Sequence, residues 1–227
     1  SPDGRPNGIQ SPGTADQACV GSMRNEGEQG ARGGDPARAL PVAFYARPAI
    51  ELAPDLLGHV LVRRSADGLT SGRIVETEAY PGPEDDASHA AARIGRTRRN
   101  DPLFGLPGTV YMHCNYGVHW CLNAVAAEVG KPEGVLIRAV EPLEGRELMR
   151  LRRGRSELTN GPGRLGQAFG LGPELQRHPL DRVPVWIEPG VPVTPADTIC
   201  TTRIGIRRAA DRPWRWYDAR STWVSGR

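Results

Sequence analysis

The chain has 227 residues and a net charge of +3, and 38% of its residues are hydrophobic. This length is sufficient for one domain with a buried core, and the modest positive charge permits a nucleic-acid partner without requiring one. We see no apolar run of membrane-spanning length and no signal peptide, and the four cysteines form neither a CxxC pair nor a zinc-site spacing. We therefore expect a cytoplasmic protein with no membrane partner and no metal.

The first part of the chain predicts a tail, a short helix and a pair of strands. Residues 1–40 are rich in glycine, proline and charge, so we expect them to be disordered and the domain to span residues 41–227. Residues 48–58 predict a helix with Pro48 in its first turn and a break at Pro54. Residues 59–64 and 72–80 predict two paired strands joined by a polar turn.

The second part predicts a hairpin, a further strand, two helices and a run of short strands. Residues 87–107 have no regular pattern. The predicted elements are strands at 109–113 and 118–126 around a turn at 114–117, a strand at 134–140, a helix at 142–153, a short helix capped by Asn160, and short strands over 185–226. The mixture predicts an α+β fold (mixed α/β): one domain around a curved antiparallel sheet with flanking short helices and a protruding hairpin.

Residues 72–89, GRIVETEAYPGPEDDASH, are the most informative segment. Strand alternation places Ile74, Glu76, Glu78 and Tyr80 on one face and Val75, Thr77 and Ala79 on the other. Carboxylates on a partly buried face need partners, and such costly groups are often kept for chemistry. The ordinary alternative is a solvent-facing or salt-bridged glutamate. We interpret the acidic residues that follow, Glu84, Asp85 and Asp86, as a solvated turn.

Two polar residues interrupt the later apolar strands. Arg138, in GVLIRAV, needs an anionic partner if it is buried, with Glu78 the first candidate and Glu76 the second. Such a pair can hold a water molecule, or it can be a purely structural ion pair. Asn123, in HWCLNAV, is either structural or part of a pocket wall, because a buried amide must be hydrogen-bonded.

The hairpin and the arginines provide candidate contacts with DNA. Tyr116 is at the predicted hairpin tip, where an aromatic side chain can wedge between bases or fold back on its own strands. Of the 29 basic residues only Lys131 is a lysine, and arginine suits phosphates, although a GC-rich genome gives the same bias. The candidate phosphate contacts, each of which can equally be a solvated surface residue, are Arg93, Arg96, Arg98, Arg99 and Arg164.

Together these segments resemble the alkyladenine (3-methyladenine) DNA glycosylase family. Seven strings between residues 43 and 225 occur in the order typical of the family: LLGHVLVRR, GRIVETEAYPGPEDDASH, TRRN, GTVYMHCNYG, LIRAVEPLEG, LTNGPGRLGQAFG and STWVS. The resemblance implies a single mixed α/β domain with no metal and no redox cofactor.

The resemblance also implies residue roles. Glu78 matches the general base, and Arg138 matches the arginine that helps to hold the attacking water. The residues that match the family's base-recognition positions are Tyr80, which stacks on the flipped base; His89, which hydrogen-bonds near the base and sugar; Asn123, which excludes the amino group of normal guanine; and Tyr116, which fills the gap left in the duplex.

One position departs from the family. His113 stands where the family usually has a tyrosine that forms the second face of the aromatic sandwich around the base. Histidine offers less stacking area and can titrate, so we expect it to become protonated near pH 6–7 and to alter the substrate range.

The expected function is that of a monofunctional DNA glycosylase in base excision repair. It would act as a monomer, associated with the nucleoid through DNA, and excise alkylated or deaminated purines (3-methyladenine, hypoxanthine or ethenoadenine type) from duplex DNA without a cofactor. A lyase step needs an amine, and the only side-chain amine is Lys131, outside the motifs.

Two other functions remain open. The first is a metal-dependent phosphoesterase built on Glu76, Glu78, Asp85, Asp86 and His89. The second is a module that binds damaged DNA without catalysis, if His113 in place of the usual tyrosine makes the pocket inactive. An RNA-binding role would rest on fold analogy alone.

Overall fold

The computed structural model describes residues 34–226. The expected tail therefore lies mostly outside the described residues. Its last part packs on the domain: the amides of Gly34 and Asp35 donate to Glu188 Oε1 at 2.9 and 2.7 Å, a 3-10 turn covers Pro36–Arg38, and Leu40 is buried. The packed chain thus begins several residues before the expected start at residue 41.

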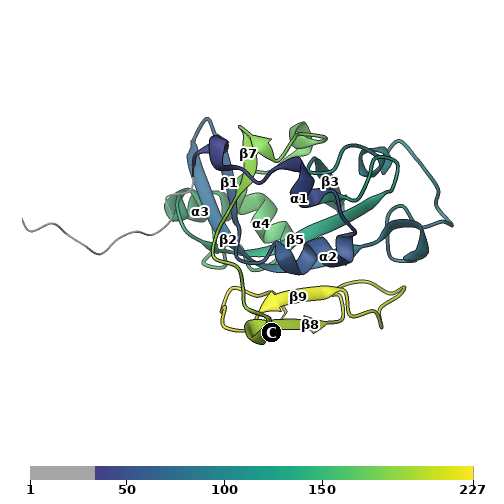
Figure 1. The fold of residues 1–227 in the computed structure, drawn as a ribbon. Helices are drawn as coiled ribbons and strands as arrows, with labels where there is room; N and C mark the ends of the chain where they lie inside the picture. The colour runs from purple at the N-terminus through teal and green to yellow at the C-terminus, as the bar shows by residue number, and fades with distance from the viewer. Residues whose placement is uncertain (1–33, 227) are drawn as a thin grey trace, which may run out of the picture. The chain divides into compact units, whose positions relative to one another are not determined.

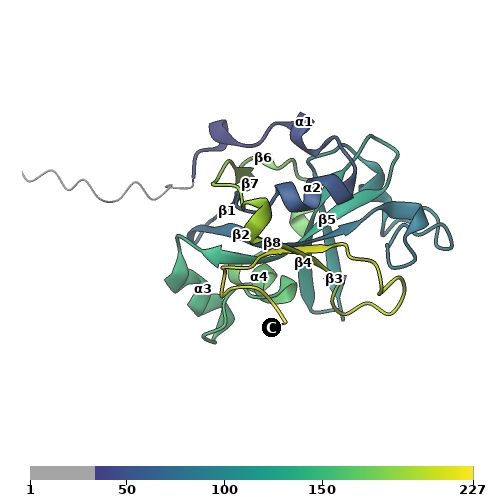
Figure 2. The same ribbon diagram turned by 60° about the horizontal axis from the view of Figure 1, so that its bottom comes forward.

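A nine-stranded antiparallel sheet confirms the predicted fold class. The order is β3-β4-β5-β2-β1-β7-β6, with β9 beside β2 and β8 beside β9 (Figure 1). The strands are β1 Val60–Ser65, β2 Gly68–Tyr80, β3 Val110–Asn115, β4 His119–Ala126, β5 Glu133–Pro142, β6 Asp181–Arg182, β7 Val185–Glu188, β8 Thr198–Thr201 and β9 Arg215–Asp218. β2 pairs with β5 along one edge, and with β1 and then β9 along the other. β8 pairs with β9, which in turn pairs with β2, and Figure 2 shows the labelled strand β8 in this part of the sheet.

The helices are short and flank the sheet. They are α1 Val42–Tyr45, α2 Ala49–Asp55, α3 Arg146–Arg153 and α4 Pro162–Phe169, with 3-10 turns at Gly82–Glu84, Asp101–Phe104, Pro173–Leu175 and Pro195–Asp197. No helix within residues 34–226 is long and apolar enough to cross a membrane.

Three predicted helix ends differ from the structure. Pro48 is the N-cap of α2 rather than part of its first turn, and Pro54 lies inside the helix. α3 begins after residue 145, because the chain through Pro142 still belongs to β5. The N-cap of α4 is Gly161 rather than Asn160.

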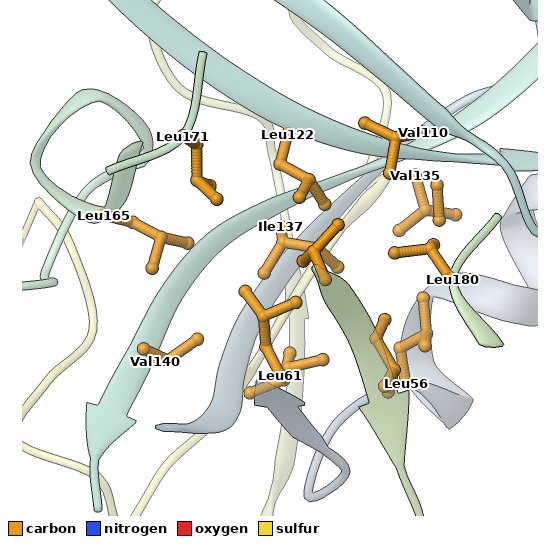
Figure 3. Packing of buried hydrophobic residues seen from close by; sticks show 14 of the residues in the cluster. Leu56, Leu61, Val110, Leu122, Val135, Ile137, Val140, Leu165, Leu171 and Leu180 are labelled. Atoms are coloured by element: carbon orange, nitrogen blue, oxygen red, sulfur yellow. The ribbon is translucent and has the colours of Figure 1, made fainter. Parts of the chain in front are cut away.

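The main hydrophobic core lies between one face of the sheet and α2 and α4. Figure 3 shows side chains from the strands and both helix regions converging: Leu56, Leu61, Val110, Leu122, Val135, Ile137, Val140, Leu165, Leu171 and Leu180. On β3, β4 and β5 the core residues mostly alternate with residues that point to the opposite face, as a half-buried sheet requires. The opposite face is therefore available for a polar site.

Two β-bulges change the alternation where β2 meets β5. The ladder pairs Ile74 with Val140, Glu76 with Ala139 and Thr77 with Ile137, so Val75 and Arg138 each stand as an extra residue. Ile74 consequently packs in the main core, whereas Val75 packs with Ala139 and Val224. The predicted faces of Ile74 and Val75 were wrong, because a bulge reverses the alternation before Glu76.

Gly166 allows α4 to lie directly on β4. A Cβ atom at this position would stand 2.0 Å from the carbonyl oxygen of Trp120, which is backbone and cannot move aside. We expect Gly166→Ala to lower the free energy of unfolding by about 1–3 kcal/mol, the usual cost of overpacking, as measured by urea denaturation. At Gly163, in the same helix, a Cβ would meet the His119 side chain at 3.0 Å. Because that ring can shift, Gly163→Ala is the control and should lose less stability; equal losses would contradict the prediction.

Candidate active site

A pocket of about 350 Å³ lies on the sheet face opposite the main core. Alternation on four adjacent strands supplies much of its wall: Tyr80 from β2, Gly134, Leu136 and Arg138 from β5, Cys121 and Asn123 from β4, and Tyr111, His113 and Asn115 from β3. Cross-strand pairing sets these residues side by side, with Tyr80 opposite Gly134 and Leu136 opposite Asn123. The remaining wall includes the loops that contain His89 and Ile204, together with Leu103, Tyr116 at the hairpin tip and Pro162 of α4.

Glu76 is the centre of a buried ionic cluster. Its Oε1 accepts hydrogen bonds from Arg138 Nε at 2.9 Å, Arg215 Nε at 2.7 Å and Ser225 Oγ at 2.9 Å, and its Oε2 accepts one from the Ser225 amide at 2.7 Å. All four groups are buried. This carboxylate therefore has its acceptor capacity used by structural partners, and it joins β2, β5, β9 and the C-terminal segment.

Glu78 lies next to this cluster and has fewer partners. Its Oε1 accepts from the Ile204 amide at 2.8 Å and lies 3.2 Å from Arg138 Nη1, and its Oε2 accepts from the Tyr80 hydroxyl at 2.8 Å. The carboxylate is fully buried, behind Tyr80, Arg138 and Ile204, which do line the pocket. Arg138 thus contacts both predicted partners, with the shorter contact to Glu76. Burial alone would lower the pKa of Arg138, but the charges of Glu78 and Glu76 raise it.

Tyr80 is held between the pocket and a stack that the sequence analysis missed. The Arg203 guanidinium lies 4.7 Å from the centre of the Tyr80 ring and 4.9 Å from that of Trp214. Arg203 also donates two hydrogen bonds to Asp85, at 2.6 and 2.8 Å, and both side chains are fully buried. Asp85 is therefore no part of a solvated turn, in contrast to our interpretation, whereas Glu84 and Asp86 are exposed.

A group of rings forms another part of the pocket wall. The rings of His89 and His113 have centroids 3.9 Å apart, and the Tyr111 hydroxyl lies 3.0 Å from His89 Nδ1. Arg99 Nη2 lies 3.4 Å from His113 Nδ1 and donates to the Cys114 carbonyl at 3.1 Å.

These contacts disfavour the charged form of both imidazoles. Burial, then His89 and Arg99, lowers the pKa of His113 to about 3. Burial and Arg99 also lower the pKa of His89. The expectation that His113 becomes protonated near pH 6–7 was therefore wrong, because desolvation and neighbouring groups disfavour its charged form.

Asn123 is a nearly buried pocket residue with a fixed amide. Its Nδ2 donates to the Tyr111 carbonyl at 3.1 Å and to that of Cys121 at 3.4 Å. The amide group is thus oriented by its own hairpin, and it combines the structural role and the pocket position that the sequence left as alternatives.

Tyr116 projects from the hairpin tip. Its side chain is 86% exposed, and both Tyr116 and Gly117 have positive φ angles, of 51° and 72°. A left-handed conformation is unfavourable for tyrosine, and the hairpin nevertheless presents this ring to solvent at the mouth of the pocket. The alternative of a tyrosine folded back on its own strands does not occur.

The predicted phosphate-binding arginines differ in how free they are. Arg93 interacts with Asp86, Arg96 with Asp101, Arg99 with the hairpin and Arg164 with Asn160. Several exposed arginines form no side-chain hydrogen bond or ion pair with a described residue, among them Arg98, Arg155, Arg207 and Arg208.

Arg207 and Arg208 were missed by the sequence analysis. They follow Ile204, Gly205 and Ile206, which line the pocket, so the loop carries free positive charge toward its rim. Arg215 and Ser225 were also missed. An arginine between Trp214 and Trp216 in a strand could have indicated a buried charge that, like Arg138, needs a carboxylate.

The carboxylates proposed for a metal site have other partners. Glu76 and Glu78 contact Arg138, and Asp85 is paired with Arg203. Within residues 34–226, no three His, Cys, Asp or Glu side chains gather closely enough to hold a metal ion. The observed geometry is that of a carboxylate–guanidinium site beside a ring-lined pocket.

Comparison with known proteins identifies related sequences. Residues 43–222 match the methylpurine-DNA glycosylase family. The chain is 42% identical to a protein of Salinibacter ruber over 82% of this chain and 96% of that protein, and 44% identical to one of Chlorobaculum parvum over 83% and 91%. A third relative, from Rubrobacter xylanophilus, is 49% identical over 71% and 84%. All three are provisionally named 3-methyladenine DNA glycosylases.

The partly buried environment of His113 predicts a pH-dependent contribution to stability. Because its pKa is lowered to about 3 in the folded chain and is about 6.5 in an unfolded one, the unfolded chain binds more protons between these values. This contribution is complete above pH ~6.5 and is lost as the pH falls toward ~3.

Tyrosine does not titrate in this range. Denaturant titrations at pH 7 and pH 4 should therefore show that His113→Tyr gains stability relative to the unmodified chain at the lower pH. A stability difference that is the same at both pH values would contradict a lowered pKa of the His113 imidazole.

Proposed function

Since the chain belongs to the methylpurine-DNA glycosylase family and is a DNA glycosylase of base excision repair, we propose that it flips alkylated or deaminated purines out of duplex DNA. It excises them by hydrolysis of the N-glycosidic bond and acts as a monomer. 3-Methyladenine is the substrate in the names of its relatives, and hypoxanthine and ethenoadenine are further candidates. The observation that carries the proposal is the buried Glu78–Arg138 pair behind the pocket.

The pocket supports recognition of a flat aromatic base. A flipped purine would lie against the ring of Tyr80, with His113 and His89 on its other side and Asn123 at its edge. The neutral imidazoles suit cationic alkylated purines, because a protonated wall would repel them. The volume lies within the range of small-molecule sites.

The proposed chemistry is a hydrolytic displacement at the anomeric carbon. Glu78 takes a proton from a water molecule that Arg138 helps to hold, and the water oxygen bonds to C1′ as the C1′–N bond breaks. The bonding electrons leave with the purine, which is a good leaving group when it is cationic or protonated. No amine attacks C1′ in this scheme, since Lys131 is exposed and paired with Glu128, so the reaction is monofunctional.

The direct test uses duplex oligonucleotides that carry hypoxanthine, ethenoadenine or an alkylated adenine. After incubation, alkali cleaves any abasic sites, and strand scission reports base release. Undamaged duplexes are the control. An absence of scission with every lesion would contradict the proposed function.

Glu78→Gln should abolish most excision and leave lesion binding intact. Loss of a general base costs about 10²–10⁴-fold in rate, which single-turnover scission assays measure, while gel shifts measure binding. The matched control is Glu84→Gln, which removes an exposed carboxylate from the turn after β2 and should keep the rate. Near-normal turnover by Glu78→Gln would refute the role of Glu78.

Tyr116→Ala should impair excision from duplex DNA more than from single strands. A wedge is useful only where a base stack must be held open. The control is Val118→Ala, which removes another exposed apolar side chain from the hairpin. Equal losses by Tyr116→Ala on both substrates would mean that Tyr116 supports folding rather than base flipping.

A further inference from the structure

We propose that the hydroxyl group of Tyr80 is a positioning group for the Glu78 carboxylate, so that one side chain both stacks on the damaged base and orients the general base. The inference rests on the proposed function, because it assigns Tyr80 a task in the hydrolysis itself. It goes beyond stacking, which uses only the ring.

The first support is the set of donors around Glu78. The Tyr80 hydroxyl donates to Oε2 at 2.8 Å, while the Ile204 amide and Arg138 hold Oε1. Donors on both oxygens fix the plane of the carboxylate. Without the hydroxyl, both of these remaining donors would act on Oε1, and Oε2 could turn about the last side-chain bond.

The second support is that Tyr80 itself cannot turn easily. The Arg203 guanidinium lies over its ring at 4.7 Å and is locked by two hydrogen bonds to the buried Asp85 and a further one to the Ala79 carbonyl. The tyrosine also lines the pocket. A base stacked on this ring would therefore press on a side chain that is held at the back by Arg203 and at its tip by Glu78.

The third support is that the hydroxyl keeps its proton. Burial, then the charge of Glu78 and the hydrogen bond to it, raises the pKa of Tyr80 well above its ordinary value. The phenol can thus act only as a hydrogen-bond donor toward the carboxylate at neutral pH. The attacking water must then use an acceptor position on Glu78 that Tyr80, Ile204 and Arg138 leave open.

The test is a double-mutant cycle with Tyr80→Phe, Glu78→Gln and the double variant. Phenylalanine keeps the ring, so lesion affinity, measured by gel shift in the Glu78→Gln background, should change by no more than about two-fold. The single-turnover excision rate of Tyr80→Phe at saturating protein should fall about ten-fold, equivalent to about 1.4 kcal/mol, a reasonable value for one hydrogen bond to a charged group. In the Glu78→Gln background the same substitution should cause no further loss, because its effect passes through the carboxylate.

Tyr111→Phe is the matched control. It removes a hydroxyl from the same pocket, but one that contacts His89 rather than Glu78. Its effect on the rate should therefore persist unchanged in the Glu78→Gln background. Thermal unfolding of each variant establishes that the chain is folded.

Three results would overturn the inference. They are an unchanged rate for Tyr80→Phe, a loss that is equal in both backgrounds, and a loss of lesion affinity that matches the loss of rate. If the unmodified chain releases no base from any lesion, the proposed function fails, and the inference fails with it. A catalytically active chain with additive variants instead refutes only the role of the hydroxyl.

Discussion

The buried ionic cluster around Glu76 is the interaction on which the rest of the structure depends. Carboxylate and guanidinium groups are expensive to remove from water, and the cost is offset only when every donor and acceptor finds a partner. Here a single carboxylate receives four hydrogen bonds, from Arg138, Arg215 and Ser225. Those partners come from β5, from β9 and from the C-terminal segment. The hydrogen bonds to Glu76 therefore hold these three parts of the chain against the middle of β2. Loss of Glu76 would remove the carboxylate that Arg215 contacts and would leave Arg138 with Glu78.

This arrangement divides two neighbouring glutamates between two tasks. Glu76 and Glu78 are both fully buried. The hydrogen bonds that Glu76 accepts all come from structural partners, whereas Glu78 retains an acceptor position beside the pocket wall. Arg138 touches both, so the structural cluster also fixes the guanidinium that faces the pocket. A rigid support of this kind holds reacting groups in place before the substrate arrives.

The parts of the fold and site that the sequence predicts are those encoded locally. Alternation indicated the strands β1 to β5 and the shared face of Glu78 and Tyr80, because a period of two needs only neighbouring residues. The resemblance to a known family, rather than alternation, implied the places of His113 and Asn123 in the pocket wall. Three features could not be predicted, because they depend on residues far away in the sequence or on the pairing with another strand. The partner of Asp85 is Arg203, 118 positions away; the bulge at Val75 exists only relative to β5; and the neutral state of His113 comes from burial and from His89 and Arg99.

The paired bulges make the number of residues in β2 and β5 as important for this region as the identity of those residues. Val75 and Arg138 are each one residue in excess, on opposite strands, and the two excesses compensate. Deletion of Val75 alone would leave Ile74 and Thr77 facing the core and Glu76 and Glu78 facing the other way, but the extra residue Arg138 would then have no counterpart in the ladder. A change of length on one strand here therefore changes the pairing of the bulge on the other strand, whereas the exposed turn at Ala66 and Asp67 lies outside the bulged part of the ladder. The segment therefore offers a poor place for grafting or loop redesign, and the turn between β1 and β2 offers a good one.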